Sequence, residues 1–199
     1  MQCVPLCLII AQNTMIEIGK YNTLKIDRDT KVGLFLTDGN ADILLPNKYV
    51  PEEYEIGDEI AVFVYLDHEE RPIATTLEPY IFLNEFALLR VNYTNKFGAF
   101  MNWGMEKDLF VPFKEQARPM EQGKRYLVYM YIDEKTGRLV ASSKTNQFLD
   151  NKVITVEKGE EVDLIISHIT EVGINVIINE KHKGCLLYTS PSPRDLSTT

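Results

Sequence analysis

The residues best suited to binding chemistry lie in one short stretch, residues 95–116, where aromatic rings alternate with basic side chains. Phe97 and Phe100 flank Gly98 on a predicted strand, and Trp103 follows closely. Aromatic rings on a β-surface stack on nucleic-acid bases with little sequence preference, at about 1–3 kcal/mol per base. The stretch therefore predicts a surface for single-stranded nucleic acid, with Phe97, Phe100 and Trp103 as the stacking rings.

The spacing of the two phenylalanines needs a distortion of the strand. Residues three apart on a regular strand point to opposite faces. A glycine inside a strand often marks a bulge or bend, so Gly98 predicts a distortion that turns both rings toward one outer surface. The alternative is that one or both of Phe97 and Phe100 belong to the core.

The basic residues are concentrated in the same part of the chain. Residues 15–80 carry 6 Lys and Arg against 14 Asp and Glu, a net charge of −8, whereas residues 81–147 carry 10 against 7, a net charge of +3. Phosphate contacts supply most of the non-specific affinity for nucleic acid. We expect such contacts from the basic residues that flank or follow the aromatic strand, unless they are ordinary solvated charges: Arg90, Lys96, Lys107, Lys114 and Arg118.

Signals of catalysis, cofactor binding or metal binding are missing from the sequence. The three histidines lack metal-ligand spacing, and no glycine-rich phosphate loop opens a helix. The three cysteines lie near the two ends, which fits a reducing cytoplasm. No apolar run reaches the 18 residues of a membrane span. We expect a cytoplasmic, non-enzymatic protein without cofactor, metal or membrane contact.

An internal repeat organises the chain. "KVGLFLTDGNADILLPNKY" aligns with "KFGAFMNWGMEKDLFVPFKEQ", so that Gly33 matches Gly98 and Pro46 matches Pro112, with a period of about 65–67 residues. A third copy begins at residue 158 and is cut short. A fixed period of this kind predicts successive copies of one structural unit.

Each repeat is expected to form short strands. "AVFVYLD" and "YLVYMYID" are rich in β-branched and aromatic residues, and each runs into a charged turn and a further apolar strand. Five short strands in about 65 residues fit a small closed barrel of the OB type. The predicted fold is therefore all-β, with tandem five-stranded OB-fold barrels and an incomplete third. A β-sandwich spanning both repeats is the alternative.

The second repeat resembles an S1 domain, the OB-fold module of many RNA-binding proteins, through "NKFGAFMNWGMEKDLFVPF" and "YIDEKTGRLVASS". The tandem arrangement is similar to the conserved virulence factor B family, also called the YitL family, over roughly residues 16–184. That resemblance implies three S1-like domains followed by a winged-helix domain, and binding of RNA. It implies a bacterial regulator of gene expression that acts after transcription.

The resemblance and the repeat together predict the domain boundaries. We expect S1-like domains at 15–80 and 81–147 and an incomplete third at 148–184. Residues 1–14 precede a second methionine, Met15, and are expected to be a non-native leader rather than a signal peptide. Residues 185–199 begin "CLLYTSPSPRD", which matches a translated sequencing adapter, so we expect an artefact rather than a natural Ser/Pro tail.

The predicted function is binding of single-stranded RNA, with single-stranded DNA as a further ligand, by a monomer that acts through its second domain. In repeat 1 the positions of Phe97 and Phe100 hold Val32 and Phe35 on an acidic domain. We therefore expect domain 1 to dock a protein partner or act as a spacer. The alternative for the whole chain is a set of OB-fold protein-interaction modules that bind no RNA.

Overall fold

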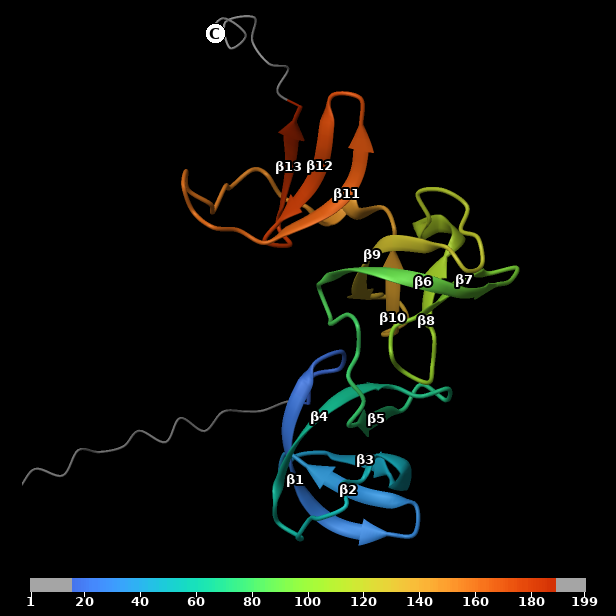
Figure 1. The fold of residues 1–199 in the computed structure, drawn as a ribbon. Helices are drawn as coiled ribbons and strands as arrows, with labels where there is room; N and C mark the ends of the chain where they lie inside the picture. Colours follow the sequence, from blue (N-terminus) through green and yellow to red (C-terminus); the bar gives the residue numbers. More distant parts are fainter. Residues whose placement is uncertain (1–15, 189–199) are drawn as a thin grey trace, which may run out of the picture. The chain divides into compact units, whose positions relative to one another are not determined.

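The computed structural model describes residues 16–188, which form strands joined by turns and three short 3-10 helices (Figure 1). The expected leader at 1–14 and the end of the expected adapter at 189–199 lie outside the described residues. Within residues 16–188 there is no α-helix, and no helix long and apolar enough to cross a membrane. The chain divides into two compact units between Glu78 and Pro79.

The first unit contains a closed five-stranded barrel with the strand order β1-β2-β3-β5-β4. We call it barrel 1. All neighbouring strands are antiparallel except β3 and β5, which run parallel. Its strands and its one 3-10 helix are β1 (Tyr21–Thr30), β2 (Gly33–Thr37), β3 (Asp42–Pro46), η1 (Asn47–Tyr49), β4 (Glu59–Leu66) and β5 (Pro72–Thr75).

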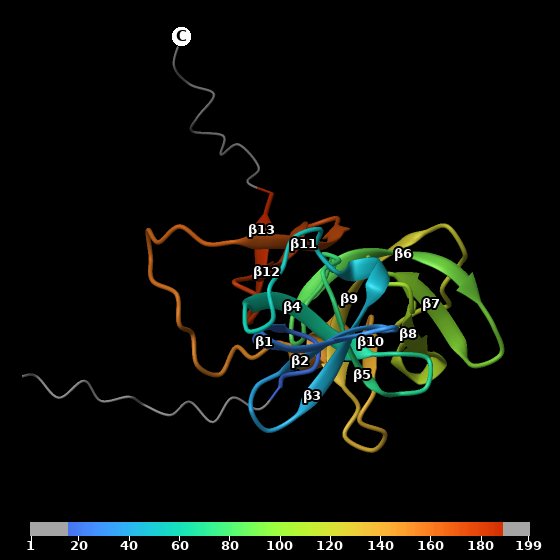
Figure 2. The ribbon, with the colours of Figure 1, turned by 90° about the horizontal axis from the view of Figure 1, so that it is seen from below.

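The second unit repeats this barrel with the same order and directions, and we call the copy barrel 2. Its β6, β7 and β8 run beside one another (Figures 1 and 2). The elements of barrel 2 and the 3-10 helix that follows are β6 (Phe86–Thr94), β7 (Gly98–Asn102), β8 (Leu109–Pro112), η2 (Phe113–Glu115), β9 (Arg125–Ile132), β10 (Leu139–Ser142) and η3 (Thr145–Phe148).

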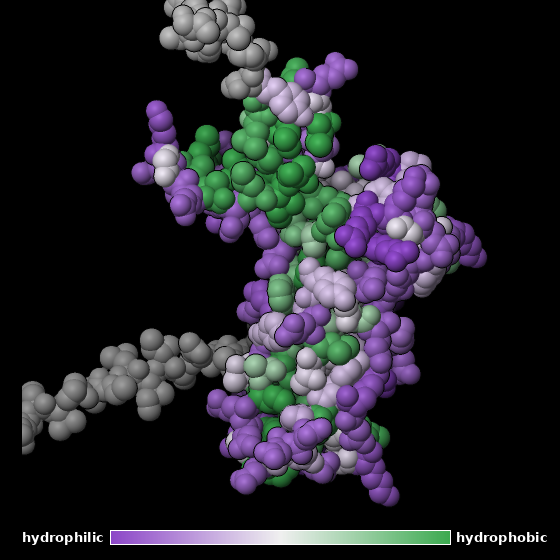
Figure 3. Space-filling view, in the orientation of Figure 1, coloured by the Kyte–Doolittle hydropathy of each residue, from purple (hydrophilic) through white to green (hydrophobic). Residues whose placement is uncertain are grey.

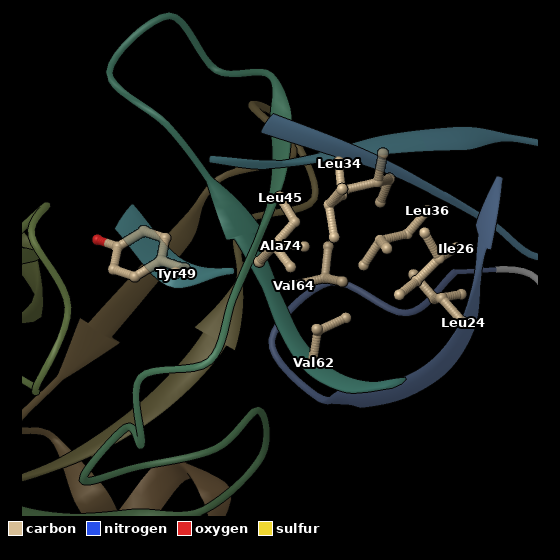
Figure 4. Close-up of a cluster of buried hydrophobic side chains, with 10 residues drawn as sticks. Leu24, Ile26, Leu34, Leu36, Leu45, Tyr49, Val62, Val64 and Ala74 are labelled. Carbon is tan, nitrogen blue, oxygen red and sulfur yellow. The ribbon is translucent and has the colours of Figure 1, made fainter. Parts of the chain in front are cut away.

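Each barrel encloses its own apolar core, which excludes a β-sandwich shared between the repeats. Strand side chains alternate between the two faces, and the inward positions of barrel 1 carry leucine, isoleucine and valine (Figure 4). Barrel 2 uses alternate residues of each strand in the same way, as in Ala99 and Met101 of β7, which are both inaccessible to solvent. The prediction of an all-β fold with tandem OB-type barrels is confirmed.

The matched glycines have one packing role in both barrels. Gly33 is opposite Pro46, and Gly98 is opposite Pro112. A Cβ atom at Gly98 would overlap the carbonyl oxygen of Val111, and a Cβ at Gly33 would overlap that of Leu45. The second strand of each barrel therefore approaches the third more closely than any other residue type allows.

The third repeat forms a three-stranded sheet of the order β11-β12-β13. Its strands are β11 (Leu164–Thr170), β12 (Gly173–Ile178) and β13 (His182–Leu187). They correspond to the first three strands of a barrel, and residues 16–188 contain no fourth or fifth strand for this sheet, in line with the predicted incomplete barrel. Cys185, Leu186 and Leu187, which begin the expected adapter, pair with β12 in this sheet.

Candidate nucleic-acid interface

Three aromatic rings form a continuous row on the outer face of barrel 2, one from each of three adjacent strands. Tyr93 of β6 stacks on Phe100 of β7, with ring centroids 4.6 Å apart and planes 9° from parallel. Phe100 packs on Phe110 of β8, with centroids 5.0 Å apart and planes at 35°. Each pair is directly opposed in the strand register, so strand pairing holds the rings side by side. We call Tyr93, Phe100 and Phe110 the aromatic row.

The aromatic row faces away from the core. Phe100 lies between Ala99 and Met101, whose side chains are fully buried, so strand alternation turns Phe100 outward. Phe100 and Phe110 are half-buried by their neighbours, and Tyr93 is 44% exposed. The row therefore brings apolar ring atoms to the surface without exposing the core, although one face of Phe100 is covered by Tyr93.

The distortion that the sequence predicts at Gly98 is found on the neighbouring strand instead. The pairing of β7 with β8 is regular through Gly98 and Ala99. The pairing of β6 with β7 shifts between Val91 and Tyr93, which leaves Asn92 as an extra residue. Such a β-bulge re-aims side chains and adds twist.

Phe97 precedes β7 and lies in the β6–β7 turn, where its ring is 61% exposed. Its backbone N–H donates to Asn95 Oδ1 (2.8 Å), and its carbonyl accepts from the Phe113 N–H (3.3 Å). Phe113 is itself 55% exposed. Neither Phe97 nor Phe100 is in the core, because the turn projects the first ring and strand alternation projects the second.

The expectation that Trp103 extends this surface is wrong. Its side chain is 2% exposed, and its indole N–H donates to the Lys107 carbonyl oxygen at 2.5 Å. Ala99, Met101 and Trp103 are alternate residues, so their side chains point to the same face, and all three are buried. Trp103 therefore closes the core at the end of β7.

Three of the five basic candidates lie on the elements that carry the exposed rings, and one of them contacts a ring. Lys96 Nζ is 5.0 Å from the centroid of the Phe97 ring, in cation–π range. Lys114 is exposed in η2, directly after Phe113. Arg90 is an exposed residue of β6 and lies opposite Asn102. Asn102 is two residues along β7 from Phe100, so both point to the same outer face.

The other two basic candidates are placed differently. Lys107 is half-buried in the β7–β8 loop, whose conformation is held by the Trp103 indole. Arg118 lies with its guanidinium carbon 5.4 Å from the centroid of the Tyr126 ring, at the start of β9. The structure therefore does not bring Arg118 to the aromatic row.

A polar pair lies next to the aromatic row. Asn92 Nδ2 donates to Asp108 Oδ1 at 2.7 Å, from the bulge of β6 to the residue before β8. Burial raises the pKa of the Asp108 carboxyl, and the hydrogen bond from Asn92 opposes this shift. A partly desolvated carboxylate thus lies beside the rings in the barrel with net positive charge.

The corresponding bulges of the other two units have different chemistry. In barrel 1 the bulge lies between Ile26 and Arg28, and Arg28 is opposite Phe35. The guanidinium carbon of Arg28 is 4.3 Å from the Phe35 ring centroid. In the third sheet the same place is taken by His168 and Asn175, which are hydrogen-bonded at 3.1 Å. Within residues 16–188, a row of three rings at these positions occurs only in barrel 2.

Sequence reasoning missed Tyr93, Phe110 and Phe113, as well as the Asn92–Asp108 pair. The signal for Phe110 was present: with Gly98 opposite Pro112, an antiparallel register puts Phe100 opposite Phe110. Tyr93 required knowledge of the bulge, which no residue in "RVNYTNK" marks. Among residues 16–188, no group of three or more His, Cys, Asp or Glu side chains is placed to hold a metal ion.

Comparison with known proteins identifies the domain type. The sequence pattern of the S1 domain family matches residues 18–77. These residues include all of barrel 1, which is therefore similar to an S1 domain. Barrel 2 repeats the strand order and directions of barrel 1 and aligns with it through its glycine and proline pairs.

Two relatives extend this result beyond the first barrel. The chain is 38% identical to the uncharacterized protein YitL of Bacillus subtilis over 129 residues, which is 62% of this chain and 43% of YitL. The predicted resemblance to YitL is thereby confirmed, and the chain spans less than half the length of that relative. A multidomain protein with nucleic acid binding domains from Streptococcus pneumoniae has the same fold at a TM-score of 0.56 and 17% identity, over 87% of this chain and 65% of that one.

Proposed function

We propose that barrel 2 binds single-stranded RNA by stacking bases on the aromatic row and on Phe97, with phosphates held by Arg90, Lys96 and Lys114. The observation that carries the proposal is the set of three rings held side by side by strand register. Stacking on exposed rings beside basic residues is how OB-fold domains bind single strands. The net charge of +3 on residues 81–147 supports the choice of barrel 2.

The relatives support the same ligand class. The Streptococcus pneumoniae protein is described as having nucleic acid binding domains, and residues 18–77 of this chain match the S1 domain family. We propose that the chain is a cytoplasmic RNA-binding protein that regulates gene expression after transcription, rather than an enzyme. Its proposed domains are 15–80, 81–147 and an incomplete third at 148–184.

We propose a different role for barrel 1. Its equivalent position is filled by Arg28 on Phe35, and residues 15–80 carry a net charge of −8, which repels phosphate. A domain of this kind suits docking of a protein partner or spacing. OB-type folds accept several ligand classes, so the ligand has to be argued from the site rather than the fold.

The test is the change Phe100→Ala in the full chain, with Phe35→Ala as the matched control at the equivalent position of barrel 1. Binding of a fluorescein-labelled single-stranded RNA of eight nucleotides is followed by anisotropy at several salt concentrations. We expect Phe100→Ala to weaken binding roughly ten-fold, because one stacked base contributes about 1–3 kcal/mol. Phe35→Ala should leave the affinity unchanged.

Salt dependence separates phosphate contacts from stacking. Each phosphate contact in a single strand contributes about 0.7 to the slope of log K against log salt. The change Lys96→Ala should therefore lower that slope, whereas Phe100→Ala should weaken binding with little change of slope. Binding that responds equally to Phe35→Ala and Phe100→Ala, or no binding at low salt, contradicts the proposal and favours a protein-interaction module.

A further inference from the structure

We propose that barrel 2 selects guanine among the RNA bases, with the Asp108 carboxylate accepting the N–H groups of a guanine stacked beside the aromatic row. This inference rests on the proposed function and adds base selection to it. It is carried by three observations: the place of Asp108, the hydrogen bond that orients it, and a planar N–H donor that fills the equivalent place in barrel 1.

Register places Asp108 on the outer face next to the rings. Phe100 is opposite Phe110 and Met101 is opposite Leu109. Continuing this register by one residue places Asp108 opposite Asn102. The residues of β7 that point outward are Phe100 and Asn102. Asp108 directly precedes β8 and is two residues from Phe110, about 6–7 Å for extended backbone, which is within the span of one base.

The bulge of β6 fixes the direction of the carboxylate. β7 lies between β6 and β8, so the bond from Asn92 to Asp108 crosses the outer face of β7. Asn92 is the extra residue of the bulge and is exposed. Asn92 donates to Oδ1, and each carboxylate oxygen accepts more than one hydrogen bond, so the carboxylate retains capacity for further donors.

Barrel 1 already contains a planar group of N–H donors in the equivalent place. Asp42 precedes Ile43 as Asp108 precedes Leu109. Arg28 Nη1 donates to Asp42 Oδ2 at 2.9 Å while its guanidinium lies over the Phe35 ring. The same Nη1 also donates to Asp27 Oδ2 at 2.6 Å, so one ring and two carboxylates together hold this flat, N–H-rich group by stacking and hydrogen bonding.

Guanine is the base whose edge most resembles that guanidinium. Its N1–H and N2–H₂ donors lie side by side on a three-atom N–C–N unit and meet both oxygens of a carboxylate. Cytosine and adenine place one amino group beside a ring acceptor, which repels the second carboxylate oxygen. Uracil has one N–H between two carbonyl groups. Single-stranded RNA exposes these Watson–Crick edges to protein side chains.

A carboxylate on this surface also argues against a role in phosphate binding. Its negative charge repels the backbone, and its raised pKa reflects partial loss of water. A partly desolvated acceptor is stabilised by a ligand that donates hydrogen bonds and is destabilised by one that does not. The position therefore favours the edge of a donor base over the RNA backbone.

The experiment uses the full chain and labelled octamers of uridine with one central guanosine, adenosine, cytidine or inosine. We expect the guanosine octamer to bind roughly ten-fold more tightly than all-uridine, in line with the discrimination given by a good two-bond base contact. Inosine lacks the N2 amino group and should lose most of this gain. A uridine octamer with one central 7-deazaguanosine keeps the N1 and N2 donors and should bind as tightly as the octamer with guanosine.

Two variants assign the preference to the carboxylate. Asp108→Asn keeps the size of the side chain but replaces one acceptor oxygen with a donor, so guanosine and uridine octamers should bind within about two-fold of each other. The same change should tighten binding of all-uridine, because a negative charge is removed. Glu53→Gln makes the same charge change at an exposed residue of barrel 1 and should leave the guanosine preference intact.

The outcomes separate the two proposals. If all octamers bind equally and Phe100→Ala still weakens them, the proposed RNA binding stands and guanine selection is refuted. Guanosine preference that survives Asp108→Asn also refutes the role of this carboxylate. If no octamer binds, both proposals fail together. Loss of the preference in Asp108→Asn and not in Glu53→Gln supports the inference.

Discussion

At the scale of single residues, the three repeats show one backbone position serving three different purposes. The residue after the bulge is Arg28 in barrel 1, Tyr93 in barrel 2 and His168 in the third sheet. Each contacts its cross-strand partner, through a cation–π contact, a ring stack and a hydrogen bond respectively. The fold therefore supplies the position, and the residue type decides which ligand it suits.

The glycine before the aromatic row can be tested by its effect on stability. Gly98→Ala places a Cβ against the Val111 carbonyl oxygen and 2.9 Å from the Phe110 ring. Overpacking of this kind costs about 1–3 kcal/mol, so the urea midpoint should fall. Trp103 is the one tryptophan in the sequence and is buried in barrel 2, so its fluorescence reports the transition.

The matched change is Gly33→Ala, which creates the same overlap against Leu45 in barrel 1. It should lower the thermal stability of barrel 1 and leave the Trp103 transition in place. An unchanged urea midpoint for Gly98→Ala would show that β7 and β8 can separate without loss, which would contradict the packing role of the glycine.

Sequence patterns predicted the residues that repeat and missed those that depend on register. Gly98 and Pro112 could be aligned with Gly33 and Pro46, so the barrels were predictable. Trp103 was placed wrongly because the strand was expected to bend at Gly98, whereas its regular course keeps Trp103 in phase with the buried Met101. Bulges arise from tertiary pairing, so no local residue signal reveals them.

At the scale of elements, β9 carries a second aromatic group that is covered by a 3-10 helix. Phe148 of η3 stacks on Tyr129 with centroids 4.1 Å apart and lies 5.3 Å from Tyr131. Burial, and after it the carboxylate of Glu115, raises the pKa of Tyr131 to about 12. These rings are packed by the chain itself, in contrast to the aromatic row.

The raised pKa of Tyr131 predicts how stability changes at high pH. A phenol whose folded-state pKa lies above its unfolded value, near 10, contributes stability that is complete below about pH 10. That contribution is lost as the pH rises from about 10 to 12, because the unfolded chain releases its proton first. Tyr131→Phe should therefore lose less stability than the wild type between pH 9.5 and 11.5.

Urea unfolding at a series of pH values measures this difference, with Tyr80→Phe as the control at a ring that is 65% exposed. The control should follow the wild type across the range. Equal alkaline losses in Tyr131→Phe and the wild type would show that the phenol titrates alike in the folded and unfolded chains.

At the scale of the whole molecule, the three repeats differ in how well their cores are covered. Aligning the bulges puts Leu164 at the position of Leu24 and Leu89, which are both 3% exposed. Leu164 itself is 46% exposed, Ile166 is 60% exposed, and hydrophobic residues gather on the surface of this sheet (Figure 3). In the barrels, the fourth and fifth strands cover these positions, and residues 16–188 contain no such pair for the third sheet.

The uncovered core predicts that the third sheet is the least stable part of the described chain. Burial contributes about 25 cal/mol per Å² of apolar surface, and this sheet forgoes much of that gain and leaves both outer edges unpaired within residues 16–188. Limited trypsin digestion should first cut the exposed segment at Lys152 and Lys158 and leave the two barrels intact.

The full chain should also bind the dye ANS more strongly than residues 16–148, because exposed apolar surface binds it. Equal protection of residues 149–188 and the barrels, with equal dye binding by both chains, would mean that another surface covers Leu164 and Ile166 in solution.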